Sequence, residues 1–150
     1  MDRYWDDLRL GESWTGAPFT VSAEEIVGFA SAYDPQPMHT DPEAAANGRF
    51  GGLIASGWHV AALAMRAFVG VKPFGETPIL GIGIDQLRWL KPVRPGDVLT
   101  ATREVIELKR SESKPDRGMI RTRATVVDQT GEAVMTLEVL TQMPLRPDGR

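Results

Sequence analysis

The spacing of apolar residues divides the chain into a first half with helical periodicity and a second half with strand periodicity. Residues 22–33 begin with a Ser-x-x-Glu capping box, after which apolar side chains recur at helical intervals. This pattern predicts an amphipathic helix that delivers Asp34 at its C-terminal end. A second start signal, with Asp41 at the N-cap and Pro42 at the first helical position, predicts a short alanine-rich helix that stops at Gly48.

The most apolar helix is expected over residues 56–69. Its apolar side chains occupy most of the helix circumference, which is typical of a helix buried on nearly all sides. We therefore expect Trp58, Met65 and Phe68 to belong to the core. His59 is expected to lie in the core or to line a pocket rather than to act as a second base.

After Gly70 the pattern changes to β-branched residues, alternation and turn signals. One buried helix followed by several long antiparallel strands predicts an α+β fold, a single domain over residues 1–150 in which a curved sheet wraps around the central helix. Long strands are expected over residues 79–90, 97–109, 119–128 and 132–143, a hairpin turn over 128–131, a polar loop over 111–118, a further strand within 12–20, and a loose tail over 144–150.

Composition excludes several classes of function. The chain has 150 residues, 42% of them hydrophobic, and a net charge of −3, so we expect no general attraction to nucleic acid or to an anionic membrane. It has no cysteine, which excludes disulfides and thiolate chemistry and is compatible with a reducing cytoplasm. The N-terminus lacks the apolar region of a secretory signal, and the longest apolar run is interrupted by Arg66. We expect a cytoplasmic protein.

The most informative candidate chemistry lies in residues 34–39. His39, one of two histidines, follows Asp34 by five positions, and two prolines between them stiffen the backbone into a rigid turn. A carboxylate and an imidazole held in this way could share one water molecule, which suits general acid–base catalysis. Taken without its context, Asp34 is more simply interpreted as an ordinary turn-forming aspartate, and the segments described next reverse that interpretation.

Three segments occur in an order that is typical of one family: residues 34–39, residues 50–57 and residues 90–97. The chain resembles the MaoC-like hydratase/dehydratase family, relatives of the (R)-specific enoyl-CoA hydratases with a hot-dog fold, over roughly residues 19–140. Asp34 and His39 match the family motif Asp-x-Asn-Pro-x-His, whereas Gln36 replaces its asparagine. Ser56 replaces the histidine that usually precedes Gly57 at the entry to the central helix.

The resemblance implies a hydro-lyase that hydrates 2-enoyl-CoA with (R)-specificity or dehydrates 3-hydroxyacyl-CoA. Asp34 and His39 would hold the reacting water, and the N–H of Gly57 would stabilise the developing enolate oxygen. The substrate would be an acyl-CoA or acyl-carrier thioester, with coenzyme A as part of the substrate and no separate cofactor. The resemblance also implies a homodimer with sites at the subunit interface.

Other candidate residues have a structural and a functional interpretation. Ser56 is expected to cap the central helix, although it could also touch the substrate. Gln36 is expected to form a hydrogen bond within its turn, or to orient water or ligand. Arg88, Lys91 and Arg94 could bind phosphates of the substrate carrier, or form a solvated strand face. No metal site is expected, because the two histidines lack clustered partner ligands.

Two alternative functions remain at this point. A hot-dog acyl-CoA thioesterase would direct water at the thioester carbonyl, and the Asp-x-x-x-x-His turn argues against it. A non-catalytic acyl-CoA-binding subunit would keep the fold without the chemistry. Retention of Asp34 and His39 argues against the second alternative, whereas the changes at Gln36 and Ser56 keep it open.

Overall fold

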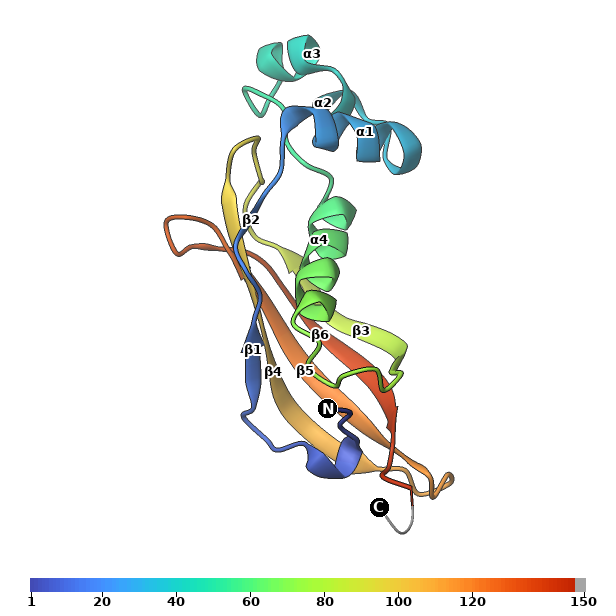
Figure 1. Ribbon diagram of the computed structural model, residues 1–150. Helices are drawn as coiled ribbons and strands as arrows, with labels where there is room; N and C mark the ends of the chain where they lie inside the picture. The colour runs from blue at the N-terminus through green and yellow to red at the C-terminus, as the bar shows by residue number, and fades with distance from the viewer. Residues whose placement is uncertain (148–150) are drawn as a thin grey trace.

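A long central helix packs along one face of a curved antiparallel sheet in the computed structural model, which describes residues 1–147 (Figure 1). The sheet has the strand order β1-β4-β5-β6-β3, and β2 pairs with β4. The strands are β1 (Ser13–Thr15), β2 (Phe19–Thr20), β3 (Leu80–Trp89), β4 (Val98–Arg110), β5 (Arg117–Val127) and β6 (Ala133–Pro144). The helices are η1 (Trp5–Asp7), α1 (Ala23–Tyr33), α2 (Pro37–Thr40), α3 (Pro42–Asn47) and α4 (Gly57–Gly70).

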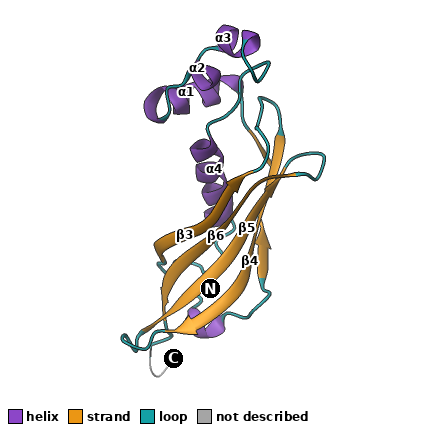
Figure 2. Cartoon of the chain, turned by 180° about the vertical axis from the view of Figure 1, so that it is seen from behind, coloured by secondary structure: helices purple, strands orange, loops and turns teal. Residues whose placement is uncertain are grey.

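The helices are distributed unevenly around this sheet. α4 runs along its concave side, α1 to α3 gather beyond one end, and the N-terminus lies toward the other end (Figure 1). Seen from behind, the opposite face of the sheet is covered by none of these four helices (Figure 2). This confirms the predicted α+β architecture of a curved sheet wrapped around a central helix.

Helix α1 begins and ends where the sequence predicts. The Ser22 hydroxyl accepts a hydrogen bond from the backbone N–H of Glu25, and the Glu25 carboxylate accepts one from the N–H of Ser22, each at 3.1 Å. The buried side chains of Ile26 and Ala30 form the apolar face of the helix. Asp34 then leaves helical geometry, with φ −153° and ψ 66°, which lies outside the helical region that the following proline disfavours.

The segment after Asp34 contains one element that the sequence pattern did not predict. The expected rigid turn is a single helical turn, α2, with Pro37 at its first position, where a missing N–H costs nothing. α3 follows as predicted, because the Asp41 side chain accepts hydrogen bonds from two N–H groups of its first turn. The helix ends at Asn47, beside Gly48.

The central helix α4 is buried on one side only. Val60 and Phe68 face the sheet and are buried, and His59 is buried as expected. Trp58 is 56% exposed and Met65 is 48% exposed, so the prediction that both belong to the core is wrong for the single chain. The physical reason is that one concave sheet face covers only one side of a helix.

The four long strands were predicted with ends that lie within two residues of those observed. Alternation along β4 turns Leu99, Ala101, Arg103 and Val105 inward, and all four are buried. The further strand expected within residues 12–20 is present as two short pieces, β1 and β2, both paired with β4.

The predicted loose tail is wrong for residues 144–146. Pro144 ends β6, Leu145 is buried, and the backbone N–H of Arg146 donates to the carboxylate of Asp6 at 2.6 Å. Residues 148–150 of that prediction lie outside the described residues. Within residues 1–147, every helix is too short or too polar to cross a membrane.

Candidate active site

Asp34 and His39 are brought together by two short consecutive elements. Asp34 is the C-cap residue of α1, and His39 lies in the single turn of α2. Nε2 of His39 lies 3.4 Å from Oδ2 of Asp34. The histidine is buried and the aspartate is partly exposed. The pair therefore lies at the boundary between the protein interior and the surface.

A backbone carbonyl fixes the orientation of the His39 ring. Nδ1 of His39 lies 2.6 Å from the carbonyl oxygen of Ile54. Because a carbonyl oxygen can only accept a hydrogen bond, Nδ1 must carry the proton in this contact. In the neutral ring, Nε2 is therefore an unprotonated acceptor that faces the Asp34 carboxylate.

Gln36 holds the other oxygen of the carboxylate. Its side-chain Nε2 donates to Oδ1 of Asp34 at 2.7 Å. This hydrogen bond is the largest cause that lowers the pKa of Asp34, followed by the nearby Ser56 hydroxyl and by His39. Gln36 thus bonds within its turn, as expected, and its partner is the candidate catalytic carboxylate.

Ser56 does not play the expected capping role. Its hydroxyl makes no capping hydrogen bond to α4, is fully buried, and has no hydrogen-bond partner within residues 1–147. It nevertheless lies close enough to Asp34 to lower the pKa of that carboxyl. A buried polar group without a partner is costly in a folded protein, and its place beside Asp34 indicates a role in the site.

Gly57 begins α4 beside this pair and is closely packed. A Cβ atom at this position would lie 2.3 Å from the indole ring of Trp89, so glycine is required for the observed packing. No acceptor within residues 1–147 takes the backbone N–H of Gly57. That N–H therefore remains available at a helix N-terminus, where the helix dipole favours negative charge.

A cleft of about 340 Å³ joins these groups. Its lining includes Asp34, His39 and Gly57, and its walls include Trp58 and Trp89, whose rings meet edge to face with centroids 5.1 Å apart. Neither tryptophan was predicted to line a site. Both come from elements predicted correctly, but which side of each element borders the cleft depends on packing.

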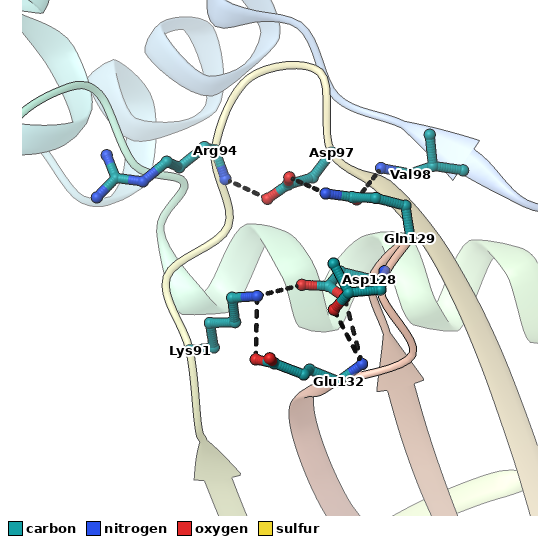
Figure 3. Close-up of polar contacts among 8 residues, drawn as sticks. Lys91, Arg94, Asp97, Val98, Asp128, Gln129 and Glu132 are labelled. Carbon is teal, nitrogen blue, oxygen red and sulfur yellow. Dashed lines mark hydrogen bonds and ion pairs between the residues drawn. The ribbon is translucent and has the colours of Figure 1, made fainter.

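Lys91 also lines the cleft, but acidic residues already neutralise it. Its Nζ lies 2.6 Å from Oδ2 of Asp128 and 3.1 Å from Oε2 of Glu132, on the predicted hairpin turn (Figure 3). These hydrogen bonds raise the pKa of Lys91. Lys91 therefore ties the segment after β3 to the β5–β6 turn.

The other two basic candidates lie outside the cleft lining. Arg94 donates from its side chain to the carbonyl oxygen of Phe50 at 2.6 Å, and its backbone N–H donates to Asp97 (Figure 3). Arg88 is exposed and bonds to the carbonyl of Leu87 and the side chain of Gln86. Arg88 thus presents its guanidinium at the surface, whereas Arg94 secures the loop.

The curved sheet around α4 and the Asp–His pair at the start of that helix define a hot-dog fold protein with a candidate acid–base site. A family model described as the MaoC like domain matches residues 9–128. The chain belongs to this MaoC-like family, whose relatives include hydratases and dehydratases.

Sequence relatives span the greater part of the chain. An uncharacterised protein of Bacillus subtilis is 35% identical over 102 residues, which cover 68% of this chain and 72% of that protein. Mesaconyl-CoA hydratase of Cereibacter sphaeroides is 33% identical over 137 residues, which cover 89% of this chain and 39% of that longer protein.

Solved structures agree with the fold along almost the whole chain. A MaoC-like dehydratase from Rhodospirillum rubrum is 37% identical with a TM-score of 0.86, and the match covers 97% of this chain and 99% of that one. An R-hydratase from Pseudomonas aeruginosa is 27% identical with a TM-score of 0.78, and the match covers 95% and 86% of the two chains.

Proposed function

We propose that the protein is a hydro-lyase for acyl thioesters, which adds water to a 2-enoyl-CoA to give an (R)-3-hydroxyacyl-CoA or catalyses the reverse dehydration. The observation that carries this proposal is the arrangement of His39 Nε2 and Asp34 Oδ2, 3.4 Å apart, in a cleft that also contains Gly57. Coenzyme A enters as part of the substrate, and the chemistry requires no further cofactor.

Two acceptors that face each other suit a water molecule, which has two protons to donate. The lowered pKa of Asp34 keeps its carboxylate ionised and makes it a weak base. His39 Nε2, which carries no proton in the tautomer fixed by the Ile54 carbonyl, is placed to accept the water proton. As the water oxygen bonds to C3, the proton passes to Nε2, and the imidazolium that forms is stabilised by the Asp34 carboxylate.

The electron pair of the C2–C3 double bond moves to the thioester and forms an enolate. The backbone N–H of Gly57 can donate a hydrogen bond to the enolate oxygen, and the dipole of α4 further stabilises the negative charge on that oxygen. The proton on Nε2 then returns to C2, and the enolate collapses to the thioester. One water molecule has been added across the double bond. Because Asp34 and His39 deliver both the hydroxyl and the proton, the two groups add to the same face of the double bond.

Carrier binding is the second part of the proposal. Arg88 is the best of the three basic candidates for a phosphate of coenzyme A, because its guanidinium is exposed and its hydrogen bonds to described residues stay within its own strand bulge. Lys91 and Arg94 would contribute secondarily, since each already serves a structural contact. A phosphopantetheine carrier protein would present the same thioester.

We also propose that two copies of the chain form a homodimer. The long edge strand β3 is almost entirely exposed in the single chain, and the apolar side chains Leu80, Ile82 and Ile84 lie on it. Exposed apolar residues of α4 add to this surface. An apolar surface of this kind marks an interaction site, and it lies beside the cleft, whose wall includes Trp89.

The test is a spectrophotometric hydration assay with 2-enoyl-CoA substrates of several chain lengths. Asp34→Asn and His39→Ala should each lower kcat/KM by about 100- to 10,000-fold, because each removes an acid–base group. Asp116→Asn, in an exposed loop, is the matched control and should leave activity unchanged. Hydration that persists undiminished in both site variants would contradict the assignment.

The same assay separates the alternative functions. Release of free coenzyme A without hydration would indicate a thioesterase, in which water attacks the carbonyl rather than C3. Tight binding of acyl-CoA without turnover of any substrate would indicate a non-catalytic binding subunit. A thiol reagent and a calorimetric titration measure these two outcomes on the same wild-type protein.

A further inference from the structure

Arg103 is a charged residue on the inward, apolar face of the sheet. It lies on β4 between the inward-facing residues Ala101 and Val105, and it is only 5% exposed. Its partners across the neighbouring strands are Trp14 and Ala124. Arginine is almost never fully buried unless it is paired, so its contacts decide what it does.

Among the described residues, Arg103 has one hydrogen-bond acceptor, so most of its donors are without a partner there. Its Nε donates to the Thr122 hydroxyl at 2.8 Å, and its guanidinium lies over the ring of Phe68, 4.0 Å from the centroid. Within residues 1–147 it pairs with no carboxylate, and burial is the only cause that lowers its pKa, to about 10. An uncompensated buried charge destabilises the fold, which favours a ligand as its partner.

The guanidinium borders an apolar cavity between α4 and the sheet. The cavity measures about 40 Å³, enough for roughly three water molecules or for one carboxylate group. Small side chains of three different elements leave this space open. Its lining includes Ala61, Ala64, Phe68, Ala101, Arg103 and Ala124.

This cavity lies next to the candidate active site along α4 and β6. Val60 and Val134 line the cleft, and the residues that follow them, Ala61 and Met135, line the cavity. Along α4, Phe68 lies about 16 Å from Gly57 at the helical rise of about 1.5 Å per residue. An acyl chain with its thioester at Gly57 would thus approach Arg103 with its far end.

We propose that Arg103 is a specificity-determining residue that binds a carboxylate at the far end of the acyl chain, so that the preferred substrates are CoA thioesters of dicarboxylic acids. The proposal rests on the function proposed above and names its substrate class. A carboxylate would accept hydrogen bonds from the guanidinium fork, neutralise the buried charge and leave the methylene chain against the alanines.

The direct test measures binding to the wild-type protein by calorimetric titration with saturated acyl-CoA thioesters, which have no double bond to hydrate. A series of increasing chain length is compared with and without a terminal carboxylate at equal carbon number. At the matching length the carboxylated ligand should bind about 10- to 100-fold more tightly, the range expected for a charged hydrogen bond. Equal or weaker binding at every length would overturn the proposal.

Variants identify the residue responsible. Arg103→Met should abolish the preference for the carboxylated ligand while retaining affinity for the neutral one. Arg123→Met, on the neighbouring strand β5 with its side chain 53% exposed, is the matched control and should retain the preference. If Arg103→Met also retains the preference for the carboxylated ligand, Arg103 is not the residue that binds the carboxylate. If that variant does not fold, the wild-type comparison decides alone.

These readouts separate the two proposals. A preference for the carboxylated saturated ligand without hydration of any enoyl-CoA would overturn the hydro-lyase and leave Arg103 as a ligand-binding residue. Hydration without any preference would overturn the role of Arg103 and leave the hydro-lyase.

Discussion

At the scale of single residues, the candidate site depends on neighbours that orient each reactive group. The Ile54 carbonyl selects the tautomer of His39, and the Gln36 amide holds one oxygen of Asp34. Groups held in this way need not reorganise when charge moves during a reaction. Neither contact involves the substrate, yet both determine which atom acts as the base.

Ser56 gives a prediction at this scale. Ser56→Ala removes a hydroxyl that lowers the pKa of Asp34, so that pKa should rise. The measurement is an NMR titration of the Asp34 carboxyl carbon. Its titration profile should move to higher pH in Ser56→Ala.

The outcome for Ser56→Ala has a clear control. Ser111→Ala, in the exposed loop between β4 and β5, should leave the profile in place. The melting temperature at neutral pH should fall slightly, because a hydroxyl that lowers the pKa of Asp34 also stabilises the folded state in which Asp34 is ionised. Superimposable profiles for wild type and Ser56→Ala would show that the hydroxyl does not act on Asp34.

The sequence predicted the site only as far as local chemistry specifies it. Asp34 and His39 could be paired in advance because prolines restrict the few residues between them. The contact between the Ile54 carbonyl and His39 could not be predicted. Every residue has a backbone carbonyl, and only the fold brings that of Ile54 to His39. Arg103 had a readable signal, a charge at an inward position of an alternating strand.

At the scale of elements, long periodic segments were predictable and single turns were not. The four long strands and the helices α1 and α4 repeat their spacing of apolar residues many times. A single residue that departs from this spacing therefore does not hide the element. η1 and α2 contain three and four residues, too few for a period to emerge. The prolines indicated a turn at α2, but its helical form depends on the elements around it.

The contact between α1 and α4 gives a prediction about pH and stability. His59 on α4 stacks on Phe29 of α1 with ring centroids 4.6 Å apart, and burial lowers its pKa from the ordinary 6.5. The unfolded chain therefore binds a proton more readily than the folded one. The free energy of unfolding should be highest above about pH 7 and should decrease as the pH falls through about 6.5.

Urea unfolding at a series of pH values from about 8 to 5.5 measures this effect. His59→Phe keeps an aromatic ring against Phe29 but cannot be protonated, so its stability should decrease less over the same range. His39 is present in both the wild type and His59→Phe, so any contribution from it is the same in the two stability curves. Parallel curves would show that the titration of His59 does not contribute.

At the scale of the whole molecule, the apolar pattern of α4 is wider than the face of the helix that the sheet of one chain covers. The sequence predicted burial on nearly all sides, and the sheet of one chain covers only one of them. Trp58, Met65 and Val69 remain exposed on α4. A sequence pattern records where residues are buried, but it does not say which copy of the chain buries them.

The homodimer proposal is tested by sedimentation velocity at micromolar concentration. The wild-type protein should sediment as a dimer, and Ile84→Glu should sediment largely as a monomer, because a charge would be buried in the apolar contact on β3. Lys109→Glu, an exposed change on β4, should remain dimeric. A wild-type protein that stays monomeric at this concentration would contradict the proposal.

The edge-to-face pair of Trp58 and Trp89 has a consequence for observing this protein. Both indoles border the cleft and both are about half exposed, at 56% and 45%. An indole emits at a wavelength set by the polarity around it, so any molecule that displaces solvent from these rings changes their colour of emission. The protein therefore carries its own optical reporter at the mouth of the cleft, and a fluorimeter can follow occupancy without a label.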